Sequence, residues 1–265
     1  MNPTPLFFLL LFTLAAYGQQ GQSFLDSRDG KKYKAVKIGN QIWMGENLNY
    51  NASGGKCYGE GGEVPIANNE TDDNGDIIGE EIMITLSNDE IQANCNKYGR
   101  LYDWPTAMSL PSNCNKDSCS SQIQPKHKGI CPSGWHIPNN YDWGDLLRFV
   151  DSNTGIKGPY DTDTKKPYYS ETAGQYLKTN SDDWEPYEKE GLDTYGFSAL
   201  PSGCKHYYSN GSFSFGSVGY SGHWWSTSEL NSNSAYFWTM SYDWNGAGFD
   251  LHYKSNLKSV RCIKD

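Results

Sequence analysis

The stretch 196–265 constrains the fold most, because short aromatic runs alternate there with groups of glycine, serine and asparagine. Each run has the length of a strand, and turn-forming dipeptides such as Asn210-Gly211 and Asn245-Gly246 separate the runs. In one run the alternation places four side chains on a single strand face, which we expect to be buried: Tyr236, Trp238, Met240 and Tyr242. This part of the chain therefore predicts many short antiparallel strands.

Three segments predict helices. The clearest is 140–151, where apolar residues recur at helical spacing: Trp143, Leu146, Leu147 and Val150. A second helix is expected over 171–179 after a Ser170 cap. A short third helix is expected after Trp104-Pro105, because proline suits a first helical turn.

The amino-terminal part predicts strands followed by a surface excursion. Residues 26–50 place apolar side chains around a Gly39-Asn40 turn, which is typical of a β-hairpin. From 54 to 89 the composition changes to Gly, Asn, Asp and Glu, so we expect a long surface excursion, with an acidic insertion at about 59–92. A few helices packed on short antiparallel strands define an α+β domain.

The first residues predict export. Residues 6–16 form an apolar run about half as long as a membrane-spanning helix needs, and small residues follow at Ala16 and Gly18, the −3 and −1 positions of a cleavage site. We expect a signal peptide over 1–18, a short linker over 19–25 and one domain over 26–265. No later segment is apolar enough to span a bilayer. The protein is therefore expected to be secreted, either extracellular or at the cell surface, and not membrane-spanning.

Composition and charge narrow the function classes. With 37% hydrophobic and 14% aromatic residues, the chain is too apolar to remain disordered. Its 31 acidic residues against 22 basic ones give a net charge of −9, which would repel a polyanion, so no nucleic-acid partner is expected. The sequence lacks a nucleophile elbow, a phosphate-binding glycine loop and an HExxH motif, and its five histidines are scattered. We therefore expect no catalytic residues.

Seven cysteines predict a disulfide framework, because exported proteins meet an oxidising compartment. They are Cys57, Cys95, Cys114, Cys119, Cys131, Cys204 and Cys262. Pairing of nearest neighbours joins the first with the second and the third with the fourth, and leaves Cys131 or Cys204 to pair with Cys262. Zinc is the less favoured alternative, because only the third and fourth cysteines are closely spaced.

The aromatic side chains of the carboxyl-terminal half are expected to serve mainly as core, with three exceptions. Trp244 precedes a turn dipeptide, and Tyr207 and Tyr208 stand just before another one. Aromatic rings beside turns are hard to bury and make platforms on which sugar rings or peptides stack. We take these three residues as candidates for ligand binding.

The insertion contains a candidate calcium loop. Oxygen-bearing side chains fall at positions 1, 3, 5, 7 and 12 of a twelve-residue loop that has glycine at position 6: Glu70, Asp72, Asn74, Asp76 and Glu81. A glutamate at position 1 is longer than the usual aspartate, so the alternative is a solvated acidic insertion. Calcium is therefore the one candidate cofactor.

A series of short segments spans nearly all of the expected domain. They are 29–33 (DGKKY), 36–44 (VKIGNQIWM), 46–50 (ENLNY), 95–104 (CNKYGRLYDW), 131–138 (CPSGWHIP), 196–203 (GFSALPSG), 223–229 (HWWSTSE) and 259–265 (SVRCIKD). In this order they resemble the Fibrobacter succinogenes major paralogous domain, a large family of secreted bacterial proteins.

The resemblance implies a C-type lectin-like fold, in which two helices flank a small antiparallel core and the ends of the chain come together. It also implies that Cys131 pairs with Cys262 and that Cys204 is the free thiol. The Glu-Pro-Asn and Trp-Asn-Asp strings by which related folds bind sugar through calcium are absent, and 184–187 and 243–245 match only fragments of them. The fold class also includes the formylglycine-generating oxidase, but here only one cysteine lies near the carboxyl terminus.

The sequence therefore favours a secreted, non-catalytic binding or adhesion module whose ligand is an extracellular polysaccharide or a surface protein. The alternative is an enzyme, either a carbohydrate-active hydrolase or a degenerate relative of the oxidase.

Overall fold

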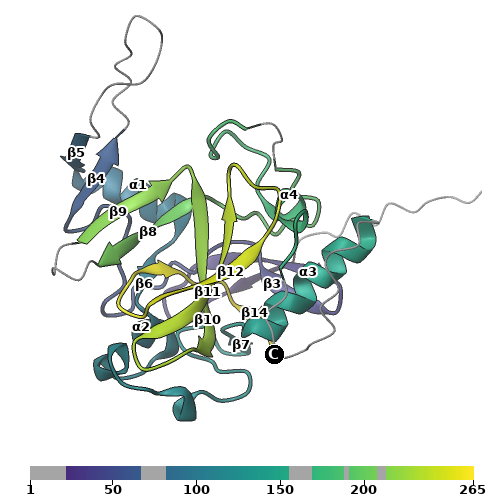
Figure 1. Cartoon of the computed structure of the whole chain (residues 1–265), viewed down its shortest axis with the longest axis horizontal. Coiled ribbons are helices and arrows are strands. Elements are labelled where there is room, and N and C mark those ends of the chain that lie inside the picture. The colour runs from purple at the N-terminus through teal and green to yellow at the C-terminus, as the bar shows by residue number, and fades with distance from the viewer. Residues whose placement is uncertain (1–21, 67–81, 155–168, 188–190, 208–212) are drawn as a thin grey trace, which may run out of the picture.

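The structure is a computed structural model that describes residues 22–66, 82–154, 169–187, 191–207 and 213–265 (Figure 1). The expected signal peptide over 1–18 and the Asn210-Gly211 turn lie outside these residues. Few helices and many short strands make up the described chain, which confirms the α+β class. Among the described helices, none has both the length and the apolar character needed to cross a membrane.

One sheet has five strands and joins residues from both ends of the domain. In the order β1-β2-β3-β14-β7, the strands are β1 (Gln22–Leu25), β2 (Lys32–Ile38), β3 (Gln41–Met44), β14 (Ile263–Lys264) and β7 (Trp135–His136). The predicted Gly39-Asn40 turn connects β2 to β3, with Gly39 at a φ of 61°. Strand β14 lies between β3 and β7, where Ile263 is opposite both Trp43 and His136. Residues 263–264 therefore complete the sheet that residues 22–44 begin.

A second sheet has seven strands and comes mostly from the aromatic carboxyl-terminal part. Its strands are β6 (Leu101–Tyr102), β8 (Ser202–Tyr207), β9 (Phe213–Val218), β10 (Ser221–Glu229), β11 (Ser234–Ser241), β12 (Gly248–Tyr253) and β13 (Lys258–Ser259). The main path is β12-β11-β10-β13-β6, and β8 pairs with β10 and β9. The predicted Asn245-Gly246 turn lies between β11 and β12, which pair antiparallel.

The expected burial along β11 is right for two of its four residues. Trp238 and Met240 are buried, whereas Tyr236 is half-buried. Tyr242 is also half-buried, because the strand ends at Ser241 and the alternation no longer holds beyond it. The prediction was therefore wrong for both Tyr236 and Tyr242, and Tyr242 lies in the loop just beyond the strand.

The described chain has four α-helices and two short 3-10 helices. They are α1 (Asn88–Tyr98), α2 (Trp104–Met108), α3 (Asn140–Thr154) and α4 (Ala173–Leu177), with the 3-10 turns at Ser112–Asn115 and Ser120–Gln122. Helices α2 and α3 confirm the predictions. The four apolar residues predicted to line α3 are all buried.

Helix α4 is shorter than the helix expected over 171–179, because both of its flanks pair with other parts of the chain. Ser170 forms an isolated bridge with Ala247, and Lys178 forms one with Ala199. Bridge residues need extended backbone, so the helix is confined to the residues between them. The Ser170 hydroxyl still accepts a hydrogen bond of 2.8 Å from the first helical amide.

The segment 54–89 contains more regular structure than expected. Strands β4 (Glu63–Ile66) and β5 (Ile82–Thr85) form a two-stranded sheet at the edge of the molecule (Figure 1). Ser87 and Glu90 then form the reciprocal hydrogen bonds of a capping box and start α1. The sequence analysis did not predict these strands or α1, although Ser87-x-x-Glu90 is a helix-start signal even in a segment that is poor in aromatic residues.

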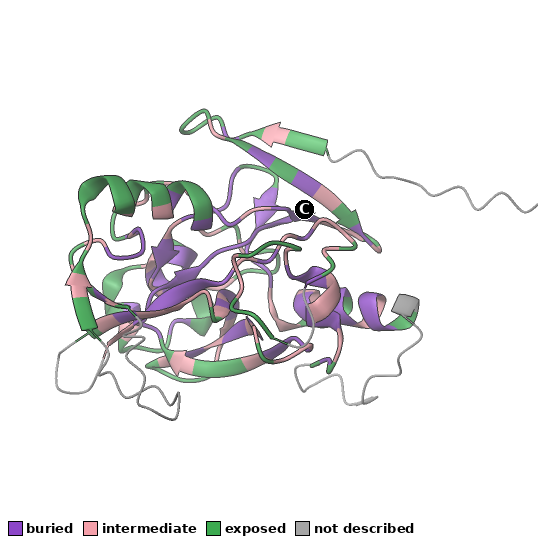
Figure 2. Cartoon of the chain, turned by 90° about the horizontal axis from the view of Figure 1, so that it is seen from above, coloured by how far each residue is buried: buried purple, intermediate pink, exposed green. Residues whose placement is uncertain are grey.

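Tryptophans join α3 to both sheets. The Trp143 ring lies 4.9 Å from that of Trp43 on β3 and 5.6 Å from that of Trp238 on β11, measured between centroids. Each such pair adds about 0.5–1.5 kcal/mol beyond the burial of its area. Buried residues accordingly concentrate in the inner strands and on the inner side of α3 (Figure 2).

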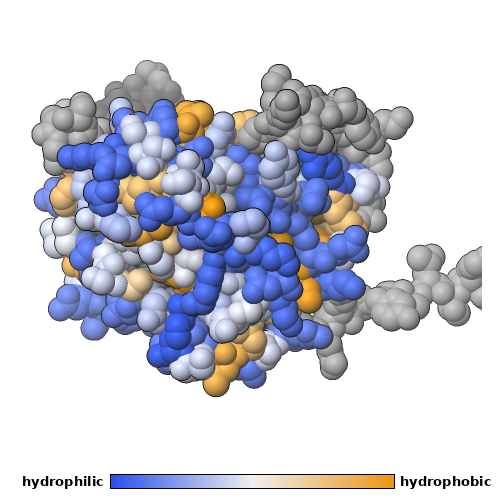
Figure 3. Space-filling model, turned by 90° about the horizontal axis from the view of Figure 1, so that it is seen from below, coloured by the Kyte–Doolittle hydropathy of each residue, from blue (hydrophilic) through white to orange (hydrophobic). Residues whose placement is uncertain are grey.

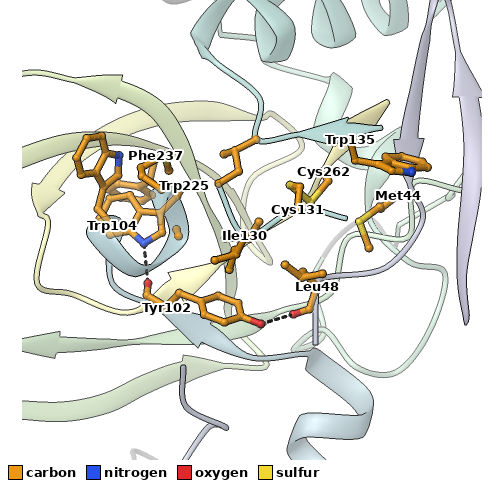
Figure 4. Packing of buried hydrophobic residues seen from close by; sticks show 14 of the residues in the cluster. Met44, Leu48, Tyr102, Trp104, Ile130, Cys131, Trp135, Trp225, Phe237 and Cys262 are labelled. Atoms are coloured by element: carbon orange, nitrogen blue, oxygen red, sulfur yellow. Dashed lines mark hydrogen bonds between the residues drawn. A yellow bond between two sulfur atoms is a disulfide. The ribbon is translucent and has the colours of Figure 1, made fainter. Parts of the chain in front are cut away.

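Three disulfides staple this fold. They join Cys57 to Cys95, Cys114 to Cys119 and Cys131 to Cys262, and Cys204 is free and buried. These are the pairs that neighbour spacing and the family resemblance indicated. The third disulfide lies in a cluster with Leu48, Tyr102, Trp135 and Trp225, where the Trp225 Nε1 donates a 2.7 Å hydrogen bond to the Tyr102 carbonyl (Figure 4).

A buried polar hub connects the ends of the domain. The Asn47 Oδ1 accepts hydrogen bonds from the Trp224 Nε1 at 2.8 Å and from the Arg261 Nη2 at 2.7 Å. Arg261 also donates to the carbonyls of Phe197 and Ser198. Burial lowers the pKa of Arg261 to about 9. Buried charges are stable only with such partners, so the hub depends on every member.

Candidate functional site

The first predicted ligand-binding residues lie at the end of β8. Tyr207 is half-buried, and its ring centroid lies 5.5 Å from that of Phe213 on β9. The Lys205 Nζ lies 5.3 Å from the same ring. Tyr208 is outside the described residues. Tyr207 therefore packs within its own hairpin and contributes to a small cluster beneath β9.

Trp244 lies elsewhere, in the turn between β11 and β12. It is half-buried, and its Nε1 donates a 3.1 Å hydrogen bond to the Glu171 carboxylate next to α4. The ring lies against Gly246, where a Cβ would come within 2.2 Å of it, so only glycine fits at that position of the turn. Trp244 thus packs on its own turn, whereas Tyr207 packs against Phe213 in a different hairpin.

The candidate calcium ligands Glu70, Asp72, Asn74, Asp76 and Glu81 lie outside the described residues. Strands β4 and β5 hold Ile66 opposite Ile82, so the two ends of this segment lie side by side. Within the part of the chain that the structure describes, no group of three or more His, Cys, Asp or Glu side chains could hold a metal ion.

A different surface forms a groove next to α4. Residues 180–187 line it together with Lys178, Gly191 and Tyr242, and its volume is about 290 Å³. This is near the lower end of the volumes of small-molecule sites, roughly 300–1,000 Å³. The groove therefore has room for a ligand the size of a mono- or disaccharide.

The loop that lines the groove is held in place at several points. The Trp184 Nε1 donates hydrogen bonds to the Thr179 Oγ1 at 3.0 Å and to the Ala199 carbonyl at 3.3 Å. The Glu185 amide donates a 2.8 Å hydrogen bond to the Gly219 carbonyl between β9 and β10. Such anchors keep the lining side chains in position without a ligand, which lowers the entropy cost of binding.

Two tyrosines, Tyr187 and Tyr242, form the aromatic wall of the groove, and Tyr220 packs against one of them from outside the lining. The Tyr242 ring lies 5.9 Å from that of Tyr187 and 5.3 Å from that of Tyr220, with both pairs edge-to-face. Tyr187 is 50% exposed, so its ring remains open to a ligand. Exposed rings on a fixed backbone provide stacking platforms.

Lys178 forms the floor of the groove. Its side chain is buried, and its Nζ donates hydrogen bonds to the carbonyls of Ser241 at 2.8 Å and Trp244 at 3.0 Å. Burial lowers the pKa of Lys178 to about 8. The lysine thereby ties the groove to the turn that carries Trp244.

Carboxylates line the rim of the groove. Burial opposes the ionisation of Asp183, but hydrogen bonds from Lys97 and Ser181 outweigh it and lower the pKa of the Asp183 carboxyl. Lys97 comes from α1 and forms an ion pair with Asp183, which attaches the loop to the first half of the chain. Asp182 and Glu185 are exposed. The rim thus offers several hydrogen-bond acceptors beside aromatic rings.

Sequence reasoning did not identify this groove. The fragments 184–187 and 243–245 lie at or beside it, but neither matches a known sugar-binding string. The available signal was the density of acidic and aromatic residues over 182–187, which read DDWEPY. Tyr242, more than fifty residues further on, could be added only from the folded chain.

Fold and site together define a disulfide-bonded α+β domain with an aromatic, acidic groove. The chain belongs to the Fibrobacter succinogenes major domain family, whose model matches residues 36–264. This confirms the resemblance seen in the sequence. Comparisons with curated proteins and with solved structures gave no significant match. None of the segments that carry the resemblance contains a residue that lines the groove.

Proposed function

We propose that this protein is a secreted, non-catalytic binding module that holds an extracellular carbohydrate in the groove beside α4. The observation that carries the proposal is the placement of Trp184, Tyr187 and Tyr242 around a recess whose rim bears carboxylates. Sugars present an apolar ring face and a girdle of hydroxyl groups. Aromatic rings bind the first and carboxylate oxygens accept hydrogen bonds from the second.

A carbohydrate fits the groove better than a protein surface does. Stable protein interfaces bury about 800 Å² on each partner, usually around an apolar centre. On the face seen from below, hydrophobic residues form small separate areas among hydrophilic ones (Figure 3). A small recess with a polar rim is the kind of site that orients a small ligand.

The scaffold supports a role outside the cell and a C-type lectin-like arrangement. Three disulfides suit an oxidising compartment, and the apolar run at 6–16 suits export. Residues 22–44 and 263–264 share one sheet, which agrees with chain ends that come together. Recovery of the protein from the culture medium with a new amino terminus near residue 19 would test export. Retention of the leader inside cells would contradict it.

Calcium binding by the loop over 70–81 is a separate proposal that rests on ligand spacing alone. If it is right, EDTA lowers the melting temperature of the parent, and Asp72→Ala removes the calcium response. An unchanged melting temperature with chelator would rule it out.

An enzyme is the alternative function. A relative of the formylglycine-generating oxidase would need a closely spaced pair of reactive thiols, but Cys262 is bonded to Cys131 and Cys204 is buried. Burial also raises the pKa of the Cys204 thiol, which disfavours the reactive thiolate. We therefore favour binding without turnover.

Calorimetry with soluble glucan, chitin and xylan oligosaccharides tests the proposal. We expect Tyr187→Ala and Tyr242→Ala to weaken binding by about 1–2 kcal/mol each, or roughly 5- to 30-fold, because each removes a ring from the groove. Tyr141→Ala is the matched control, since Tyr141 is 60% exposed on α3 and outside the groove. Equal affinities for all four proteins, or release of shortened sugars, would overturn it.

A further inference from the structure

We propose that the groove prefers saccharides that carry a free primary amine, such as oligomers of glucosamine, over neutral and acidic ones. This inference rests on the proposed function and deepens it, because it assigns the chemical class of the sugar.

The first observation is that two neighbouring residues of the groove loop, Asp183 and Trp184, each already contact an amine of the chain itself. The Lys178 Nζ lies 5.3 Å from the centroid of the Trp184 ring, within the range of a cation–π interaction. Lys97 reaches across from α1 and forms an ion pair with Asp183. The loop therefore presents an aromatic ring and a carboxylate that both attract ammonium groups.

The second observation is that two further carboxylates of the rim have no such cation. Asp182 and Glu185 line the groove and are exposed, and neither forms an ion pair with a described lysine, arginine or histidine. An amine on a bound ligand can approach either carboxylate from the solvent side. The charge-assisted hydrogen bond so formed is about twice as strong as a neutral one.

The charge balance of the groove favours the same ligands. Among the described lining residues there are three carboxylates, Asp182, Asp183 and Glu185, against one lysine, Lys178. The whole chain, these residues included, has a net charge of −9. A uronate or a sulfated sugar would meet repulsion of like charges, whereas a cationic sugar is attracted both at long range and in the groove.

The aromatic wall favours an amino sugar over a lysine side chain of a protein as the ligand. Tyr187 and Tyr242 offer ring surface on which the apolar face of a pyranose stacks. A lysine side chain has no such face, and it would leave most of the recess of about 290 Å³ unfilled. The structure therefore favours a saccharide as the bearer of the amine.

The test compares three oligosaccharides of equal length by calorimetry on the full chain produced with its disulfides. The probes are a glucosamine oligomer, its fully N-acetylated counterpart and an oligogalacturonate, at a pH where the amine is protonated. We expect the glucosamine oligomer to bind about tenfold more tightly than the acetylated one, and the galacturonate not to bind. The preference should shrink as salt concentration rises.

Variants assign the preference to the rim. The double variant Asp182→Asn with Glu185→Gln should lose most of the tenfold preference, because it removes the two negative charges that an amine would meet while each amide keeps one acceptor oxygen. Glu63→Gln on β4 is the control, because this carboxylate is exposed and lies outside the groove. A melting temperature equal to that of the parent in each variant excludes misfolding as the cause of a lost preference.

The outcomes separate this inference from the proposed function. Equal binding of the amino and acetylated oligomers, with loss in Tyr187→Ala, would overturn the amine preference and leave the carbohydrate groove intact. Binding of none of the sugars would overturn both. Binding of a lysine oligomer as tight as that of the glucosamine oligomer would overturn the assignment to a saccharide.

Discussion

The groove and the scaffold that carries it differ in where their residues come from. The polar hub of Asn47, Trp224 and Arg261 and the disulfide between Cys131 and Cys262 are built from segments that carry the family resemblance. The groove is built from Lys178, residues 180–187, Gly191 and Tyr242, which lie outside those segments. The residues that carry the family resemblance thus specify packing, and the proposed ligand site lies in the loops between them. Four predictions test this division, in order of decreasing effect.

The long disulfide should contribute most to stability. Replacing Cys131 and Cys262 together by serine opens a loop with a sequence separation of 131. The chain-entropy estimate gives a loss of about 5 kcal/mol. The same change at Cys114 and Cys119, with a separation of 5, should cost about 2 kcal/mol. Urea unfolding measures both, and equal losses would contradict the assignment of the long disulfide to the scaffold.

Removal of the centre of the polar hub should be the next largest effect. Asn47→Leu leaves the indole of Trp224 and the guanidinium of Arg261 without their shared acceptor. Breaking a buried charged network in this way costs about 3–5 kcal/mol. Denaturant midpoints check the loss. A loss of unfolding free energy below about 1 kcal/mol would show that the hub contributes little to the stability of the scaffold.

Acid should weaken the scaffold before it affects the groove. Burial lowers the pKa of His206 from 6.5 to about 4, and it lowers the pKa of His223 well below 6.5. The unfolded chain therefore binds more protons below pH 6.5, so stability present above that pH is lost as pH falls toward 4. We expect the free energy of unfolding to fall by an amount on the order of 1–2 kcal/mol between pH 7 and pH 5. This figure is discounted because His206 is partly exposed, so solvent screens its charge.

Urea midpoints at the two pH values measure the acid effect. A variant with glutamine at both histidine positions should lose most of the pH dependence. Identical midpoints for the parent at pH 7 and pH 5 would contradict the assignment to these side chains.

The ion pair between α1 and the groove loop should have the smallest effect on stability. Lys97→Met removes the partner of Asp183 in a pair whose side chains are 48% and 22% exposed. Exposed pairs contribute about 0.2–1 kcal/mol, so thermal unfolding should change little. The released carboxylate should increase the preference for a glucosamine oligomer over its acetylated form. A large loss of stability with unchanged preference would assign this lysine to the scaffold.

Sequence reasoning succeeded where local signals and tertiary packing agree. The period of apolar residues along α3 is also the pattern that buries them against β3 and β11, so periodicity predicted the helix. It failed for α4, where bridges at Ser170 and Lys178 limit the helix from outside. The groove could not be predicted from the sequence for a similar reason. Its two walls, 180–187 and Tyr242, come together only through the pairing of distant strands.

The position of β14 has a consequence for how the molecule matures. Its residues 263–264 fill the gap between β3 and β7, and the neighbouring Cys262 bonds to Cys131. The sheet that begins with β1, β2 and β3 can therefore be completed only after more than two hundred further residues have been synthesised. The order of synthesis therefore makes the closure of this sheet and the formation of the Cys131–Cys262 disulfide late events, because both need residues 262–264.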